Sequence, residues 1–157
     1  KNRLFLVCAL VETAVDNKAL SSRLGIKPSA PLRLATDDIF DTVLQIPKGS
    51  VNPFVMAQAS CNEVTLLLDD QFLACERLLF HPMRSDFTSA LAPGQLTRFL
   101  EAAAPGRFAY VDFASAEPLA LPGAGQATPA SQAGQKPAAA PAPAPRKAAG
   151  SAAGGDW

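Results

Sequence analysis

The composition of the chain changes sharply near residue 120, and this change confines the folded part to what precedes it. From Pro122 to Asp156 the sequence contains no Val, Ile, Leu, Met or aromatic residue, and it includes the stretch KPAAAPAPAPRKAAGSAAGG. Such a segment cannot bury a core, and its prolines break helices. We therefore predict one folded domain over residues 1–119 and an Ala/Pro/Gly-rich linker or tail, disordered or extended, over residues 120–157.

Charge and cysteine content narrow the class of protein. The chain carries 14 basic and 14 acidic side chains, so it has no general electrostatic attraction to nucleic acid, and any contact with RNA must be local. Three cysteines form an odd set, which argues against a disulfide framework and favours a reducing compartment. The longest apolar run, LFLVCALV, has eight residues, too few to cross a bilayer. We expect a cytoplasmic protein that does not engage a membrane.

Strand and helix patterns alternate along the first 119 residues. The predicted strands are 3–10, 31–35, 63–69, 77–80 and 108–113. The predicted helices are 17–24, capped by Asp16 and ended by Gly25; 37–44, capped by Thr36; a turn or short helix at 71–75; and a helix that opens at Pro93 and runs to 103. This order predicts an α/β (α+β) fold in which short helices pack around a mixed central β-sheet.

The first strand has a consequence for the domain boundary. Residues 3–10, RLFLVCAL, are apolar on both alternating faces, which predicts an inner strand with a neighbour on each side. The strand also starts abruptly, with only Lys1 and Asn2 before it. We therefore expect a hairpin partner upstream and a domain that is truncated at its N-terminus.

Few side chains are available for metal or nucleophilic chemistry. Cys61, Cys75 and His81 are the candidate metal ligands, but they lack a fourth partner and the close ligand pairs of zinc sites, so we expect no metal and no cofactor. His81 is the only histidine, and no Ser–His or Cys–His pair can form without it. It is either a structural residue at a strand end or a neutral imidazole that makes one hydrogen bond in a pocket.

The stretch GSVNP, residues 49–53, is the other candidate site. Gly49 can adopt a positive φ and lets a ligand approach its backbone, while Pro53 holds Asn52 extended. The N–H groups of Ser50, Val51 and Asn52 could then point outward together and hold a carbonyl oxygen or a developing oxyanion. A plain turn is the other interpretation. No Gly-Lys-Ser/Thr follows, so this is not a nucleotide-binding P-loop.

Four segments together carry a resemblance to a known family. They are RLFLVCALVETAVDNKAL, LQIPKGSVNPFVMA, LLFHPMRSDFTSAL and LTRFLEAAAPGRFAYVDF, in this order. From about residue 3 to 114 the chain resembles the prolyl-tRNA editing domains, which are related to YbaK and to the insertion domain of bacterial prolyl-tRNA synthetases. The GxxxP loop of that family falls on Gly49–Pro53, and the histidine of its HPL.N stretch falls on His81. Ser85 replaces the asparagine of that stretch, so a hydroxyl stands where the family has an amide.

The resemblance implies a hydrolase that removes a wrong small amino acid, most readily alanine, from tRNA for proline, without a metal. It implies that the loop backbone holds the substrate carbonyl and that the terminal ribose hydroxyl of the tRNA assists water. The implied catalytic residues are Gly49 and His81, and the implied substrate-binding residues are Ser50, Val51, Asn52, Pro53 and Ser85. The family's active lysine is expected upstream of this sequence and not at Lys1.

Two other functions stay open. One is hydrolysis of Cys-tRNA(Pro) by a YbaK-like relative, which pocket size would decide. The other is a catalytically inactive RNA-binding or docking appendix of a synthetase, which the replacement at Ser85 permits. The Ala/Pro-rich tail resembles the linker that joins such domains to the catalytic part of a prolyl-tRNA synthetase, so mischarged tRNA(Pro) and a fused or associated synthetase are the expected partners.

Overall fold

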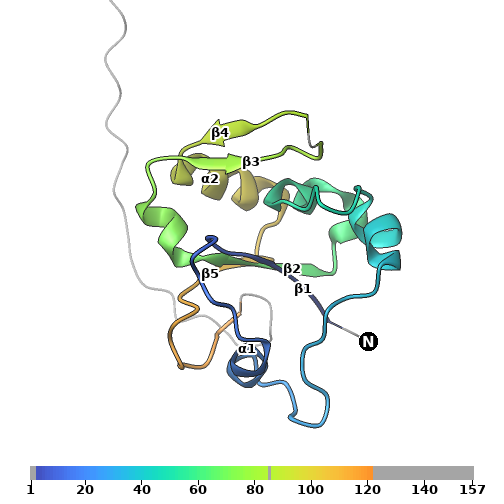
Figure 1. Ribbon diagram of the computed structural model, residues 1–157, viewed down its shortest axis with the longest axis vertical. Helices are drawn as coiled ribbons and strands as arrows, with labels where there is room; N and C mark the ends of the chain where they lie inside the picture. Colours follow the sequence, from blue (N-terminus) through green and yellow to red (C-terminus); the bar gives the residue numbers. More distant parts are fainter. Residues whose placement is uncertain (1–2, 85, 122–157) are drawn as a thin grey trace, which may run out of the picture. The chain divides into compact units, whose positions relative to one another are not determined.

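A sheet of three parallel strands organises the part of the chain that the computed structural model describes, residues 3–84 and 86–121 (Figure 1). The strands are β1 (Leu4–Cys8), β2 (Val64–Asp69) and β5 (Phe108–Val111), in the order β1-β2-β5. Each neighbouring pair is parallel. The predicted linker lies outside the described residues except for residues 120 and 121.

The central strand β2 is buried on both faces of the sheet. Leu66 and Leu68 point to one face and join the larger core cluster, and Leu67 points to the other face and joins a smaller cluster. All three leucines are fully buried. A run of consecutive buried aliphatic residues is typical of a parallel strand that is covered by other elements on both sides.

Helix α1 (Asn17–Arg23) covers the face to which Leu67 points, below the sheet in Figure 1. Its apolar side chain Leu20 and the following Leu24 pack there. The predicted cap is confirmed, because the Asp16 carboxylate accepts hydrogen bonds from the N–H groups of Lys18 (2.7 Å) and Ala19 (3.2 Å). The predicted end at Gly25 is confirmed as well, since Gly25 has a φ of 65°.

The opposite face carries the remaining helices and a hairpin (Figure 1). Helix α2 (Pro93–Ala103) buries Leu96 and Leu100 there. The hairpin consists of β3 (Leu78–Phe80) paired antiparallel with β4 (Ser89–Leu91). The short helices are η1 (Phe40–Leu44), η2 (Pro53–Ala57), η3 (Ala59–Cys61) and η4 (Asp70–Ala74). Parallel strands, an antiparallel hairpin and short helices together confirm the predicted α/β (α+β) class.

Arg107 ties three of these elements together. Its guanidinium donates to the carbonyl oxygens of Met56 (3.3 Å), Cys61 (2.7 Å) and Ala103 (3.0 Å). These carbonyls lie at the ends of η2, η3 and α2, where helices leave backbone acceptors without partners. The arginine thereby fixes η2, which begins directly at Pro53, against the rest of the fold.

One predicted strand is absent, and one predicted helix is present in a different form. Residues 31–35 form no strand, because Pro31 has no N–H and the N–H of Leu32 donates to Ser21 Oγ (2.9 Å) instead of to a neighbouring strand. Residues 37–44 form no regular α-helix: η1 is a turn of π-helix over Phe40–Leu44, and no side-chain cap from Thr36 precedes it. The other predicted strands and helices are confirmed, several of them shorter at their ends.

Strand β1 lies at the edge of the sheet. Within residues 3–84 and 86–121, β1 pairs only with β2, and its five residues are half-buried. The expected second neighbour is therefore not supplied by any described residue. In the same part of the chain, no helix combines the length and apolar character needed to cross a membrane.

Replacing Leu67 with Ala tests the two-faced burial of β2. We expect the free energy of unfolding to fall by about 2–5 kcal/mol, because the substitution leaves a cavity between the sheet and α1. Leu79→Ala is the matched control, since Leu79 lies in β3 with 66% of its surface exposed, and it should change stability by less than about 0.5 kcal/mol. Urea denaturation of both variants checks this, and equal losses would contradict the assignment of β2 as the buried strand.

Candidate functional site

The loop that contains the GSVNP sequence has the backbone shape expected from its glycine and proline. Gly49 has a φ of 93°, which favours glycine over every other residue. Asn52 is extended (φ −158°, ψ 167°), and Pro53 occupies the first turn of η2. The sequence prediction for these three residues is confirmed.

The backbone N–H groups of this loop are not all available to a ligand. The N–H of Ser50 donates to the carbonyl oxygen of Pro47 (3.0 Å) and closes a turn, so the expected set of three outward donors loses one member. Among the hydrogen bonds of the described residues, none uses the N–H of Val51 or Asn52. Val51 is exposed, as is Gly49, whereas Ser50 and Asn52 are buried. Two neighbouring donors therefore remain free in the loop.

Asn52 joins the loop to the end of β3. Its side-chain Nδ2 donates to the carbonyl oxygens of Ser50 and His81, both at 2.7 Å, and its Oδ1 accepts from the N–H of Phe54 at 2.9 Å. The structure thus brings the predicted loop and the predicted histidine together, although 29 positions separate Asn52 from His81. From the sequence, Asn52 is predicted to act only through its backbone, and the contacts of its side chain are not predicted. The one local signal for it is the Asn-Pro pair at the start of η2.

His81 follows β3 directly and is exposed. Its Nδ1 lies 2.9 Å from the carbonyl oxygen of Phe87 and 3.4 Å from Thr88 Oγ1. A carbonyl oxygen only accepts, so Nδ1 carries a hydrogen, and in the neutral ring Nε2 holds the lone pair. No feature of the sequence indicates Phe87 as the partner of His81.

A small pocket lies between the loop and the turn after His81. It measures about 400 Å³ and is lined by Pro47, Lys48, Gly49, Ser50, Met83, Arg84 and Asp86. Two exposed ion pairs lie at this pocket: Lys48 with Asp37 (2.8 Å) and Arg84 with Asp86. The hydrogen bond from Arg84 holds the pKa of Asp86 below its usual value. The remaining predicted site residue, Ser85, lies outside the described residues.

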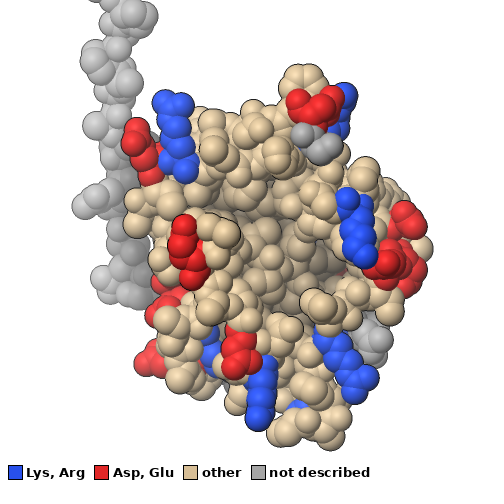
Figure 2. Space-filling model, viewed as in Figure 1, with Lys and Arg blue, Asp and Glu red and all other residues tan. Residues whose placement is uncertain are grey.

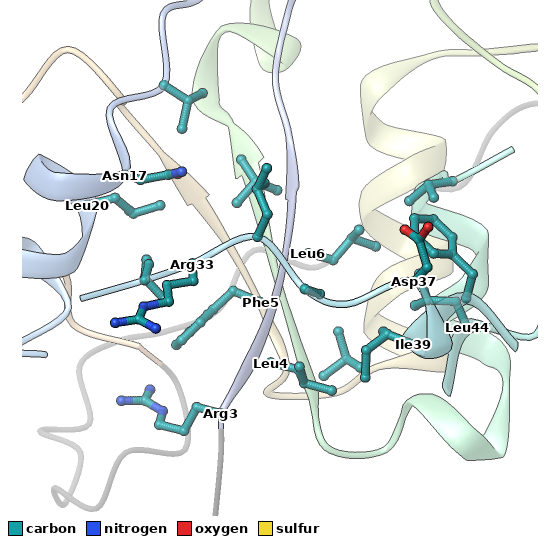
Figure 3. A pocket seen from close by; sticks show the side chains of 18 of the residues that line it. Arg3, Leu4, Phe5, Leu6, Asn17, Leu20, Arg33, Asp37, Ile39 and Leu44 are labelled. Carbon is teal, nitrogen blue, oxygen red and sulfur yellow. The ribbon is translucent and has the colours of Figure 1, made fainter. Parts of the chain in front are cut away.

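A larger pocket of about 560 Å³ runs along β1 (Figure 3). Consecutive residues from Arg3 to Val7 line it. Because alternate side chains of a strand point to opposite faces of the sheet, a pocket that contacts all of them follows an edge of the strand. This is the edge of β1 that β2 does not occupy. Figure 3 shows Arg3 and Arg33 at one end and Asp37 at the other, with Phe5 and Leu4 between them. Val51 and Lys48 also line this pocket, which therefore adjoins the loop.

One face of the molecule is hollowed. Figure 2 shows a depression near the middle of the face viewed there, with an uncharged floor and charged side chains of both signs at its margin. An uncharged floor suits a ligand group that binds through backbone donors and apolar contact.

Cys8 and Cys61 are poorly suited as nucleophiles. Cys61 is fully buried, its Sγ donates to the carbonyl oxygen of Val43 (3.4 Å), and burial raises the pKa of its thiol. Burial raises the pKa of Cys8 to about 12. A thiol is nucleophilic only as the thiolate. Among the described residues, Cys61, Cys75 and His81 do not form a metal-binding group, and no other set of three or more His, Cys, Asp or Glu residues does so.

Alkylation of the folded protein should distinguish the three thiols. We expect iodoacetamide at pH 8 to modify Cys75 first, because Cys61 is inaccessible and Cys8 stays protonated. Digestion after glutamate separates Cys61 from Cys75 at Glu63, and mass spectrometry of the fragments gives each rate. Denatured protein is the control, in which all three should react. Similar rates in the folded protein would contradict the burial of Cys8 and Cys61.

Comparison with known proteins agrees with this geometry. The profile of the aminoacyl-tRNA editing domain matches residues 1–99. The chain is 34% identical over 104 residues to "Prolyl-tRNA synthetase associated domain-containing protein 1" of Danio rerio, covering 64% of this chain and 54% of that protein. It is 26% identical over 98 residues to "Prolyl-tRNA editing protein ProX" of Acetoanaerobium sticklandii, covering 62% and 58%.

A third relative gives the same result. The Xenopus laevis protein with the same name as the Danio rerio relative is 30% identical over 103 residues, covering 64% of this chain and 60% of that protein. The chain thus spans a little over half the length of the curated relatives that it matches. The matched range contains the whole Gly49–Pro53 loop and His81. The chain belongs to the aminoacyl-tRNA editing domain family.

Proposed function

We propose that this chain is an aminoacyl-tRNA deacylase that hydrolyses the ester of mischarged tRNA(Pro), with Ala-tRNA(Pro) as its preferred substrate. The observation that carries the proposal is the hydrogen bond from Asn52 Nδ2 to the carbonyl oxygen of His81, because it joins the loop to the backbone of the histidine. Membership of the editing family and the names of the relatives support the same reaction. The proline-binding pocket of a synthetase discriminates poorly against smaller amino acids, so a second site that hydrolyses the mischarged tRNA is needed.

The free donors of the loop suit the developing charge of ester hydrolysis. We assign the N–H groups of Val51 and Asn52 to the carbonyl oxygen of the aminoacyl group, where they stabilise the oxyanion. Water attacks the carbonyl carbon, the bond from that carbon to the ribose oxygen breaks, and a proton from the water passes to the ribose oxygen. The terminal ribose hydroxyl of the tRNA assists the water.

His81 suits a role as a hydrogen-bond acceptor. Its Nε2 holds the lone pair and can accept from the attacking water or from the ribose hydroxyl. Thr88 Oγ1 lies beside Nδ1. Because Nδ1 already carries a hydrogen, which it donates to the carbonyl oxygen of Phe87, this nitrogen cannot accept the hydroxyl proton of Thr88. A neighbouring hydroxyl is therefore not activated as a nucleophile, and direct attack by water is favoured over an acyl-enzyme.

The proposal extends to the partners and the compartment of the chain. Mischarged tRNA(Pro) is the substrate, and the Ala/Pro-rich segment after residue 119 links the domain to a prolyl-tRNA synthetase. The cysteines of the described residues, Cys8, Cys61 and Cys75, are all free, which fits the reducing cytoplasm.

Hydrolysis assays with three substrates test the proposal. We expect the full chain to deacylate Ala-tRNA(Pro) and to leave Pro-tRNA(Pro) intact. The pocket of about 560 Å³ is large enough for either an alanyl or a cysteinyl group, so Cys-tRNA(Pro) is the necessary third substrate. Faster release of cysteine than alanine would favour the Cys-tRNA(Pro) deacylase. Binding of tRNA(Pro) without hydrolysis of any ester would identify an inactive docking appendix and overturn the proposal.

Gly49→Val should abolish deacylation while the fold survives. A branched side chain disfavours the φ of 93° and moves the loop donors, with an expected loss of at least about 100-fold, as for removal of an oxyanion donor. Gly106→Val is the matched control, because Gly106 also has a positive φ (68°) and open space around its Cβ position, but lines neither pocket of the site. Loss of activity in both variants, or in neither, would contradict the role of Gly49.

His81→Ala should lower deacylation by roughly tenfold to a thousandfold, because it removes the acceptor at Nε2. The ring is exposed, so the melting temperature should change little. Two further variants separate the ring nitrogens: His81→Asn keeps a donor near Phe87, and His81→Gln keeps a polar group near the Nε2 position. We expect Gln to restore more activity than Asn. If His81→Asn alone retained deacylation activity, His81 would have a structural role and not a catalytic one.

A further inference from the structure

The side-chain amide of Asn52 donates to two backbone carbonyls, with a longer contact to Met83 Sδ (3.9 Å). One belongs to Ser50 within the loop and the other to His81 at the end of β3, each at 2.7 Å. The amide oxygen accepts from Phe54 N–H at the start of η2 and so fixes the orientation of the amide. With 2% of its surface exposed, Asn52 is shielded from competing water.

The carbonyl of His81 receives a second donor, and this pins the peptide that leads out of β3. The N–H of Met83 donates to it at 2.8 Å, and Met83 has a φ of 64°, which is uncommon for a residue with a side chain. The ring of His81 then closes the following turn by its hydrogen bond from Nδ1 to the carbonyl of Phe87. The backbone and the ring of His81 are thus each held by hydrogen bonds.

We propose that Asn52 is a positioning residue that locks the Gly49–Pro53 loop to the end of β3 and thereby keeps His81 in the Nδ1–H tautomer, with Nε2 free. The consequence for catalysis rests on the proposed function, whereas the effect on the tautomer rests on the hydrogen bonds alone. Without the bond from Asn52, the N–H of Met83 is the remaining donor to the carbonyl oxygen of His81 among the described residues. The peptide after His81 is then held less firmly, and the alignment of the ring with Phe87 weakens. Neutral imidazole that is free of such a partner favours the Nε2–H tautomer, whose outward nitrogen is no longer an acceptor.

A side-chain amide of this length is needed both to accept from the N–H of Phe54 and to donate to the carbonyl oxygen of His81. Serine at position 52 is a good helix cap and keeps the acceptor for Phe54, but its hydroxyl is too short to reach the carbonyl of His81. Aspartate has the shape of asparagine, yet it places a carboxylate oxygen against the two carbonyl oxygens to which Nδ2 now donates. The two substitutions therefore remove the same contact by different physical routes.

The sole histidine of the chain makes the tautomer directly measurable. In protein labelled with ¹⁵N-histidine, the imidazole nitrogens of His81 give one set of resonances, and their shifts report which nitrogen carries the hydrogen. We expect Nδ1–H in the wild-type chain and a shift toward Nε2–H in both Asn52→Ser and Asn52→Asp. Deacylation of Ala-tRNA(Pro) should fall on the order of tenfold to a hundredfold in both variants, mainly in kcat.

Gln58→Ala is the matched control. Gln58 Nε2 donates to the carbonyl oxygen of Leu44 at 2.8 Å, so this variant also loses one amide-to-carbonyl bond, but not at His81. It should keep the Nδ1–H tautomer and the wild-type rate. A tautomer that stays Nδ1–H in both Asn52 variants, or that shifts equally in Gln58→Ala, would overturn the proposal. If the wild-type chain hydrolyses no ester, the proposed function fails, and the tautomer measurement still decides the role of Asn52.

Discussion

The parallel pairing of β2 on both of its sides determines where the functional segments lie. Parallel neighbours cannot be joined by tight turns, so a long connection must precede β2 and another must follow it. The connection from β1 to β2 carries α1 and the Gly49–Pro53 loop. The connection from β2 to β5 carries β3, His81, β4 and α2. The Gly49–Pro53 loop and His81 therefore meet where the two crossovers of a single buried strand come together.

Buried polar groups hold these connections in one arrangement. Asp69 ends β2 with no exposed surface, and its carboxylate accepts from Leu10 N–H, Thr13 Oγ1 and Gln71 N–H, which fixes the exits of both β1 and β2. Asn52 is likewise a buried polar residue, located in the Gly49–Pro53 loop, and every polar atom of its side chain has a hydrogen-bond partner. A buried polar group without a partner is costly, so such contacts disfavour any alternative placement of the loop.

The sequence predicts this structure wherever the signal is local. Asp16 and Pro93 start their helices as predicted, and the aliphatic run of β2 identifies the buried strand. The failures involve competition between distant groups: Leu32 gives its N–H to Ser21, so no strand forms there. The loop shape followed from Gly49 and Pro53, but the contact of Asn52 with His81 depends on how two crossovers pack, which no local pattern encodes.

The open setting of His81 is consistent with hydrolysis. Enzymes that transfer a group to anything other than water must close their sites, because water would intercept the reactive species. When water is the reactant, exclusion is unnecessary, and a substrate attached to a bulky polynucleotide reaches an exposed site more easily than a closed one. Exposure weakens each individual contact, so such a site depends on alignment. In this chain the buried Asn52 bonds to the carbonyl oxygen of Ser50 within the loop and to that of the exposed His81. Buried polar groups thus anchor the exposed residues for which we propose a role in hydrolysis.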